Sequence, residues 1–205
     1  MPPFILSICG SYRQNGNTDG LLKKALRGAE QTGARTENIH LSDYAIEFCR
    51  GCMNCFKNDG LEVGQCSIKD DMTKIIVPKI LECDGMILGT PSYWSNVSGL
   101  MKNFIDRMLP FTYNHGGCEP SPRLKPGKKA MLYVVAGVSH RVSAFEGIHY
   151  LPFETMRIYF RSSNIEVVDC LIASDVERAG DIDHQPELLE QAFEQGKSFA
   201  SMFQD

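Results

Sequence analysis

Apolar and polar positions along the chain predict β-strands that alternate with α-helices. Residues 4–9 are a short apolar run with β-branched members, and a polar loop rich in Asn and Gly follows it. Apolar residues then return at helical spacing up to Ala29. The same alternation recurs downstream. It predicts further strands at 35–41, 85–90, 130–136 and 164–171, and further helices at 71–83, 100–107, 145–160 and 186–202.

This order of elements predicts a single α/β domain spanning residues 1–205. Five strands separated by helices favour a doubly wound parallel sheet of order 2-1-3-4-5, with helices on both faces. The segment at about 42–71 is too long for an ordinary connection, so we expect a loop insertion there. In a sheet of this order, the loops after the first and third strands flank the point where the strand order reverses. Such folds bind their ligands at that point.

The loop after the first strand has the features of a phosphate-binding site. It ends at a helix N-terminus, where unpaired backbone N–H groups and the helix dipole favour an anion. It lacks both the Lys-Ser/Thr ending of a nucleoside triphosphate loop and the G-x-G-x-x-G of a dinucleotide fold. The alternative is an ordinary polar loop with a helix cap at Asn17 or Thr18. The side chains available to a phosphate are Ser11, Arg13, Asn15, Asn17 and Thr18.

Two later loops are predicted to meet the phosphate loop at the same edge of the sheet. Residues 90–97 follow the third strand and carry two adjacent aromatic side chains, Tyr93 and Trp94, which suit a flat aromatic ligand. In the alternative interpretation these aromatics only cover the end of the sheet. The loop after the fourth strand brings Gly137 and Ser139 to the border of the same ligand, with His140 as a weaker candidate proton donor.

Four of the eight cysteines are clustered in the long segment. Cys49, Cys52 and Cys55 stand at two successive C-x-x-C steps, and Cys66 follows after ten intervening residues. This spacing brings the thiols within reach of one centre. Three interpretations stay open for them: a [4Fe–4S] cluster, a structural zinc ion, and free or redox-active thiols.

Three segments resemble the NADPH-dependent FMN reductase family, which is flavodoxin-like. They are the phosphate loop Gly10-Ser-x-Arg-x-Asn-x-Asn-Thr18, the Pro-x-Tyr-Trp-x-Asn-Val segment at 91–97, and the cysteine-rich segment. The last is similar to the compact cysteine motif of iron–sulfur flavoproteins, a branch of the group in which four such cysteines hold a [4Fe–4S] cluster. The final gap of the motif is longer here. By this resemblance the aromatic loop contacts the flavin through Pro91, Ser92, Tyr93, Trp94 and Asn96.

The resemblance implies an FMN-dependent oxidoreductase. NADPH or NADH would deliver a hydride to FMN, and the reduced flavin would pass electrons to a small acceptor such as a quinone, a free flavin, a nitroaromatic or a metal ion. No side chain is expected to act as a nucleophile, and a homodimer or homotetramer is expected. Two other functions stay open. One is an FMN electron-transfer protein, with or without a [4Fe–4S] cluster, and the other is a binding module whose cysteine loop senses redox state or holds zinc.

Composition and charge narrow the range of partners. The chain is 43% hydrophobic and 22% charged, as is usual for globular proteins, and its net charge of −4 argues against nucleic acid. Its start lacks the basic region of a signal peptide, and its apolar runs are too short to span a bilayer. We therefore expect no membrane partner and a cytoplasmic location with reduced thiols.

The remaining expectations concern single residues. The helix at 71–83 should be capped by Asp70 or Asp71 and bent or shortened at Pro78. Its buried stripe is predicted to be Met72, Ile75, Ile76, Ile80 and Leu81. Surface or subunit-interface pairs are predicted for Lys102, Asp106 and Arg107. Three cysteines in apolar patterns are expected to be small buried side chains: Cys9, Cys83 and Cys170.

Overall fold

The computed structural model describes residues 1–57, 61–113, 121–139, 141–142 and 147–204. Its centre is a parallel sheet of five long strands in the order β2-β1-β3-β7-β8. These strands are β1 (Phe4–Cys9), β2 (Arg35–His40), β3 (Gly85–Tyr93), β7 (Lys129–Val135) and β8 (Glu166–Ala173). Numbered along the chain, the long strands follow the predicted order 2-1-3-4-5, and the fold class is confirmed.

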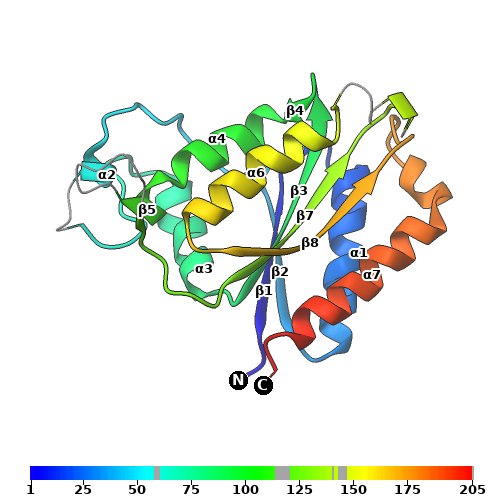
Figure 1. Cartoon of the computed structure of the whole chain (residues 1–205), viewed down its shortest axis with the longest axis horizontal. Helices are drawn as coiled ribbons and strands as arrows, with labels where there is room; N and C mark the ends of the chain where they lie inside the picture. The colour runs from blue at the N-terminus through cyan, green and yellow to red at the C-terminus, as the bar shows by residue number, and fades with distance from the viewer. Residues whose placement is uncertain (58–60, 114–120, 140, 143–146, 205) are drawn as a thin grey trace.

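Helices cover both faces of the sheet (Figure 1). On one face, α1 (Asn17–Gln31) and α7 (Pro186–Ser201) pack side by side. The other face carries α3 (Val77–Glu82), α4 (Gly99–Arg107) and α6 (Tyr150–Ser162). Across the described part of the chain, no helix is both long enough and apolar enough to cross a membrane.

Each face of the sheet has its own apolar core, because successive side chains of a strand point to opposite faces. Along β1, for example, Ile5 packs into the core under α1 and Leu6 into the core under α4. The two helices of the first face approach closely at Gly196, where an added Cβ would lie 1.9 Å from the carbonyl oxygen of Ala25. Only glycine therefore allows this spacing between α1 and α7.

Several short elements are absent from the sequence prediction. They are the strands β4 (Asn96–Val97), β5 (Thr112–Tyr113) and β6 (Ser121–Pro122), the helix α2 (Asn54–Lys57), and the 3₁₀ turns Leu41–Asp43, Leu109–Phe111 and Asp181–His184. Elements of two to four residues are too short to show a hydrophobic period. The β4 strand pairs antiparallel with β3, and β5 pairs antiparallel with β6.

The helix predicted at 71–83 is divided into two parts. A π-helix spans Met72–Ile76, and α3 begins directly after it, with Pro78 in its first turn. Proline has no backbone N–H to donate to the preceding turn, but the helical segment still reaches Glu82, so the bend or shortening expected at Pro78 stays a prediction. The wider π-turn breaks the 3.6-residue period. The predicted burial of Ile75 and Leu81 is therefore wrong, since their side chains are 36% and 42% exposed, whereas Met72, Ile76 and Ile80 are buried.

Of the two caps predicted for this helix, Asp70 and Asp71, the structure shows Asp70 in the capping position. Its Oδ1 accepts a hydrogen bond from the backbone N–H of Thr73 at 3.3 Å, and Thr73 Oγ1 accepts one from the N–H of Asp70 at 3.1 Å. Later in the chain, α6 begins at Tyr150 instead of residue 145. Cys9 and Cys83 are buried as predicted, whereas Cys170 is only partly buried. The candidate proton donor His140 lies outside the described residues.

Candidate functional site

A cavity of about 230 Å³ lies at the carboxyl edge of the sheet, where β1, β3 and β7 end. Four chain segments form it: the loop 10–16 with the first turn of α1, the end of β3, the end of β7 with the loop after it, and the connection after β8. This is the point where the strand order reverses. The lining residues are Ser11, Arg13, Asn17, Thr18, Pro91, Ser92, Tyr93, Val135, Gly137, Val176 and Glu177.

The loop between β1 and α1 forms a tight turn at this cavity. Ser11 Oγ accepts a hydrogen bond from the backbone N–H of Arg13 at 3.0 Å, and the N–H of Gly16 donates to the carbonyl oxygen of Arg13 at 3.2 Å. Gly16 is the N-cap residue of α1, and no described side chain caps this helix. The first backbone N–H groups of α1 therefore lie at the cavity without a side-chain acceptor. Such a helix N-terminus suits a phosphate group.

Two predicted phosphate contacts also tie this loop to the connection after β8. Arg13 Nη1 donates to the carbonyl oxygen of Glu177 at 2.8 Å. Asn17 Nδ2 donates to the carbonyl oxygen of Arg178 at 2.8 Å, and Asn17 Oδ1 accepts from the N–H of Gly180 at 3.1 Å. The Asn17 amide is thus engaged within the protein. Asn17 still lines the cavity, where its backbone N–H is left for a ligand, and its role in phosphate binding stays a prediction.

The aromatic loop is a β-hairpin between β3 and β4. Trp94 and Ser95 form its turn with φ angles of +50° and +57°, the left-handed region used by two-residue hairpin turns. Tyr93 lines the cavity, whereas the side chain of Trp94 stands fully exposed at the tip of the hairpin. Asn96 Oδ1 accepts a hydrogen bond from the N–H of Val97 at 2.8 Å. Trp94 and Asn96 do not line this cavity, and their contacts with the flavin stay a prediction.

Asn15 and Ser139 lie outside the cavity as well. Asn15 Oδ1 accepts a hydrogen bond from Lys23 Nζ at 2.9 Å, on the exposed side of α1. Ser139 belongs to the loop after β7 but is absent from the lining, whereas Gly137 is part of it. A Cβ atom at Gly137 would lie 3.0 Å from the Cβ of Glu177, so glycine allows this loop to approach the connection after β8.

The connection after β8 also forms part of the cavity, which the sequence did not predict. Val176 and Glu177 line the cavity from it, and Val135 does so from the end of β7. Only the topology could have indicated this connection, because the fifth strand of a parallel sheet ends at the same edge as the other four. The polar stretch at 174–185 carries no phosphate or aromatic motif that would have identified these side chains.

The cysteine-rich segment lies away from this cavity. Figure 1 shows α2 beyond the C-terminal end of α4, on the opposite side from the hairpin of β3 and β4. Cys49 and Cys52 are exposed, Cys66 is half-buried and Cys55 is buried. Burial, and then the neighbouring thiolates, raise the pKa of Cys55 to about 11. The pKa of Cys52 is lowered because the N–H of Asn54 and then the hydroxyl of Ser67 donate to its sulfur.

The spacing of these four thiols bears on the kind of metal group they would hold. Sulfur atoms that share one zinc ion at about 2.3 Å lie no more than about 4.6 Å apart. Among the described residues, no three of these cysteines bring their sulfurs within 4.8 Å of one another. A [4Fe–4S] cluster binds each thiolate at a separate iron and so accommodates wider spacing. As they lie in the described residues, the four thiols do not form a site for a single zinc ion.

A buried ion pair connects α4 with the cysteine-rich segment. Arg107 donates to Asp70 Oδ2 at 2.5 Å and to Oδ1 at 3.0 Å, and the two side chains are 1% and 6% exposed. Glu47 joins the pair through its backbone, since its carbonyl oxygen accepts from Arg107 at 2.7 Å and its N–H donates to Asp70 at 2.9 Å. Burial opposes the charge of Asp70, but these donors outweigh it, so its pKa lies below the ordinary value. The surface position predicted for Arg107 is wrong, whereas Lys102 and Asp106 do pair on the helix surface at 2.6 Å.

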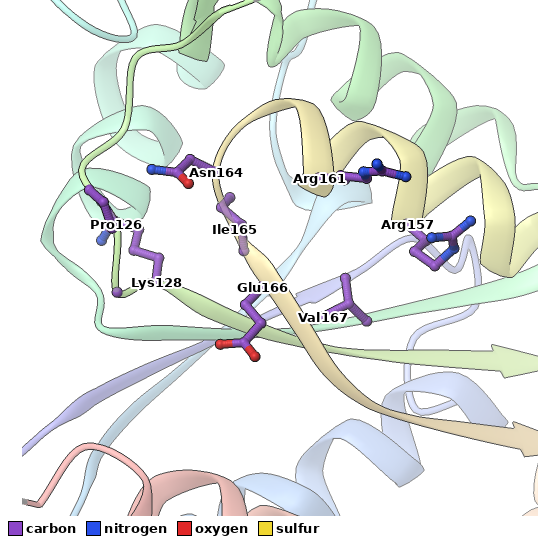
Figure 2. Close-up of a pocket in the computed structure, with 9 residues that line it drawn as sticks. Pro126, Lys128, Arg157, Arg161, Asn164, Ile165, Glu166 and Val167 are labelled. Carbon is purple, nitrogen blue, oxygen red and sulfur yellow. The ribbon is translucent and has the colours of Figure 1, made fainter.

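A second cavity, of about 410 Å³, lies at the opposite end of the sheet between α6 and the start of β8 (Figure 2). It contains several basic side chains, but two of them are engaged within the protein. Arg157 pairs with Glu154 at 2.6 Å, and Lys128 Nζ donates to the carbonyl oxygen of Leu81 at 3.1 Å. The cavity lies at the amino ends of the parallel strands, where sheets of this type do not bind their cofactors.

Comparison with known proteins identifies the family of this chain. Residues 3–146, more than half of the sequence, match the NADPH-dependent FMN reductase profile. The chain belongs to this family. Its membership confirms the resemblance found in the sequence, and the family's description names NADPH and FMN, the cofactors that this resemblance implies. The matched range includes the phosphate loop, the aromatic hairpin and the cysteine-rich segment.

Similar proteins of the NADPH-dependent FMN reductase family come from archaea and bacteria. An iron-sulfur flavoprotein of Archaeoglobus fulgidus is 35% identical over 140 residues, which are 68% of this chain and 59% of that protein. The iron-sulfur flavoprotein MJ1083 of Methanocaldococcus jannaschii is 40% identical over 106 residues, 52% of each chain. The putative NAD(P)H-dependent FMN-containing oxidoreductase YwqN of Bacillus subtilis is 36% identical over 103 residues, 50% of each chain. The chain spans about half to three-fifths of the length of these relatives.

Solved structures confirm the fold. A NAD(P)H:quinone oxidoreductase from Methanothermobacter marburgensis superposes with a TM-score of 0.73 at 17% identity, covering 97% of this chain and 100% of that one. A flavone reductase superposes with a TM-score of 0.70 at 23% identity, covering 98% of this chain and 63% of that one. These two likenesses support the flavodoxin-like architecture and nothing finer.

Proposed function

We propose that this chain is an FMN-dependent oxidoreductase that takes electrons from NADPH or NADH and passes them to a small acceptor. The acceptor classes are quinones, free flavins, nitroaromatics and metal ions. One observation carries the proposal: at a single cavity, the uncapped N-terminus of α1 and Arg13 lie beside Tyr93 and the end of β3. The first pair suits a phosphate group and the second a flat ring. FMN would supply the hydride and electron transfer.

The residues around the cavity would bind and orient the cofactor. The hydroxyls of Ser11 and Thr18 and the guanidinium of Arg13 would join the helix N–H groups around the phosphate. Because Arg13 is held by the carbonyl oxygen of Glu177, its planar fork is already oriented. At the ring end, Ser92 donates its hydroxyl to the carbonyl oxygen of Ile148 at 2.6 Å. Ser92 would therefore approach the flavin mainly through its backbone.

The predicted homo-oligomer would account for Trp94 and Asn96. Trp94 is fully exposed at the hairpin tip, and exposed apolar side chains on α6 include Tyr150, Leu151 and Ile158. The hairpin and α6 are neighbours, because Thr155 Oγ1 donates to Asn96 Oδ1 at 3.4 Å. We propose that a second copy of the chain covers this surface. In that arrangement Trp94 and Asn96 would lie at the subunit interface.

The cysteine quartet would hold a [4Fe–4S] cluster. Support comes from the four free thiols on one segment, from a spacing too wide for one zinc ion, and from relatives named iron-sulfur flavoproteins. Metal analysis of protein purified without oxygen tests this assignment. About four irons per chain are expected, with most of the iron lost in Cys52→Ser. Iron-free protein with full FMN content would contradict the cluster and leave the thiols as free or redox-active groups. The location proposed for the enzyme is the cytoplasm.

Steady-state oxidation of NADPH and of NADH, with menadione as acceptor, tests the oxidoreductase. We expect FMN-loaded protein to oxidise at least one nucleotide at a rate that depends on menadione. Protein that binds FMN but oxidises neither nucleotide would instead be an electron carrier. Protein that binds no FMN after reconstitution would contradict the proposal and favour a redox-sensing or metal-binding module.

A further inference from the structure

A second cluster of metal-ligating side chains is buried beneath the first turn of α1, apart from the cysteine quartet. Cys9 ends β1, His40 ends β2 and Asp19 lies in the first turn of α1. One ligand atom of each lies within 4.8 Å of the other two. The three residues are 0%, 5% and 1% exposed. None of them lines the proposed FMN cavity.

The sheet and the helix bring these three side chains together. Cys9 and His40 are register partners in neighbouring parallel strands, so their side chains leave the same face of the sheet. That face packs under α1, because Cys9 belongs to the core beneath this helix. Asp19 extends from α1 toward the sheet, where Asn38 Nδ2 of β2 donates a hydrogen bond to Asp19 Oδ1 at 3.0 Å. Asn38 in turn accepts a hydrogen bond from Ser7 Oγ at 2.6 Å.

Two polar atoms of this cluster lack a hydrogen bond from the part of the chain that the structure describes. His40 Nε2 is buried and has no partner, whereas His40 Nδ1 is 2.7 Å from Ser42 Oγ. Asp19 Oδ2 forms an ion pair with Lys23 Nζ at 2.7 Å but has no hydrogen-bond partner among the described residues. A histidine with one ring nitrogen anchored and the other free resembles a metal ligand with its supporting contact.

We propose that Cys9, Asp19 and His40 form a binding site for one zinc ion or a similar divalent transition metal. Thiolate, imidazole and carboxylate are the donors that zinc prefers, whereas calcium and magnesium take oxygen ligands. Binding would form one bond from the metal to each residue and release the thiol proton of Cys9 to solvent. Three protein ligands leave a fourth position for water. The ion would join the ends of β1 and β2 to the start of α1, directly beneath the phosphate loop.

Cobalt titration tests this site, since Co²⁺ replaces zinc and gives a thiolate charge-transfer absorption. The parent protein for the test is the Cys49→Ser/Cys52→Ser variant, in which two ligands of the cysteine quartet are gone. Added without oxygen, Co²⁺ should bind at one ion per chain, with the charge-transfer band, and Zn²⁺ should displace it. His40→Gln in this background should weaken binding at least tenfold. Cys9→Ser should remove the charge-transfer band.

Folding of each variant is checked by far-UV circular dichroism and by its thermal unfolding midpoint. Zinc should raise the midpoint of the parent, since a ligand that binds only the folded state stabilises it. It should raise the midpoint less in His40→Gln and in Cys9→Ser. If His40→Gln does not fold, the nearly isosteric Cys9→Ser decides the question alone. Absence of stoichiometric binding in the parent, or an unchanged cobalt spectrum in Cys9→Ser, would overturn the proposal.

Discussion

The buried pair of Asp70 and Arg107 gives a sharp prediction about stability. In Arg107→Leu, Asp70 keeps its buried carboxylate but loses two charged hydrogen bonds. The hydrogen bond from Arg107 to the carbonyl oxygen of Glu47 is lost as well. Removing one partner of a buried ion pair destabilises a protein by about 3–5 kcal/mol. In a chain of this size each kcal/mol lowers the melting temperature by roughly 2–4 °C. We expect a fall of roughly 10 °C.

Urea unfolding and thermal unfolding at pH 7 measure this effect in a double-mutant cycle. Arg107→Leu and Asp70→Asn should each be strongly destabilising, while the double variant should be more stable than the sum predicts, because no buried charge is left alone. Lys102→Leu is the matched control on the same helix. Its surface pair with Asp106 should contribute less than about 1 kcal/mol.

Acid should remove the same stabilisation. The pKa of Asp70 is lower in the folded protein than in the unfolded chain, so the pair stabilises fully above the unfolded pKa of about 3.9. The stabilisation is lost as the pH falls through the lower folded pKa. The difference in free energy of unfolding between wild type and Arg107→Leu should therefore become smaller in acid. The reasoning is refuted if Arg107→Leu unfolds within about 1 kcal/mol of wild type, or if the cycle is additive.

Three further predictions concern the site and the surface. Gly137→Ala should weaken FMN binding in a fluorescence titration, because the added Cβ would push against Glu177. The same crowding should lower the free energy of unfolding by about 1–3 kcal/mol. An unaltered FMN affinity would show that the close approach of Gly137 to Glu177 does not shape the site. In metal-free protein, iodoacetamide should alkylate Cys52 faster than Cys55 and at lower pH, because the pKa of Cys52 is lowered and that of Cys55 is about 11. Peptide mapping checks the order, and the reverse order would contradict it. Trp94→Ala should weaken self-association in sedimentation equilibrium, and an unchanged mass would exclude the hairpin tip from the interface.

The fold could be predicted from the sequence because its three central strands, β1, β3 and β7, are buried on both faces. Runs such as 86–88 and 130–136 are continuously apolar, and turn residues separate them from the helices. The π-turn at Met72–Ile76 could not be predicted from the same pattern. A hydrophobic period reports only average helical spacing, and a single π-turn changes that spacing locally.

The candidate site was predictable where the motif and the topology coincide. Arg13 and Tyr93 belong to loops that follow the first and third strands, and both line the cavity. The sequence was less informative about how a side chain is used once the chain is folded. Asn17 binds the backbone of a connection more than 150 residues away, and Arg107 finds a buried partner in Asp70. Both contacts arise from long-range packing, which no local spacing encodes.

Comparison of FMN with riboflavin, which lacks the phosphate, tests the central claim most directly. Charged hydrogen bonds contribute about 1.5–3 kcal/mol each, so two of them at the α1 N-terminus and Arg13 should make FMN bind roughly 100-fold tighter or more. Arg13→Ala should weaken FMN binding about 10-fold or more without affecting riboflavin binding. Arg27 is exposed on α1, and Arg27→Ala should leave the binding of both ligands unchanged. Equal affinities of wild type for FMN and riboflavin would contradict the assignment of this cavity.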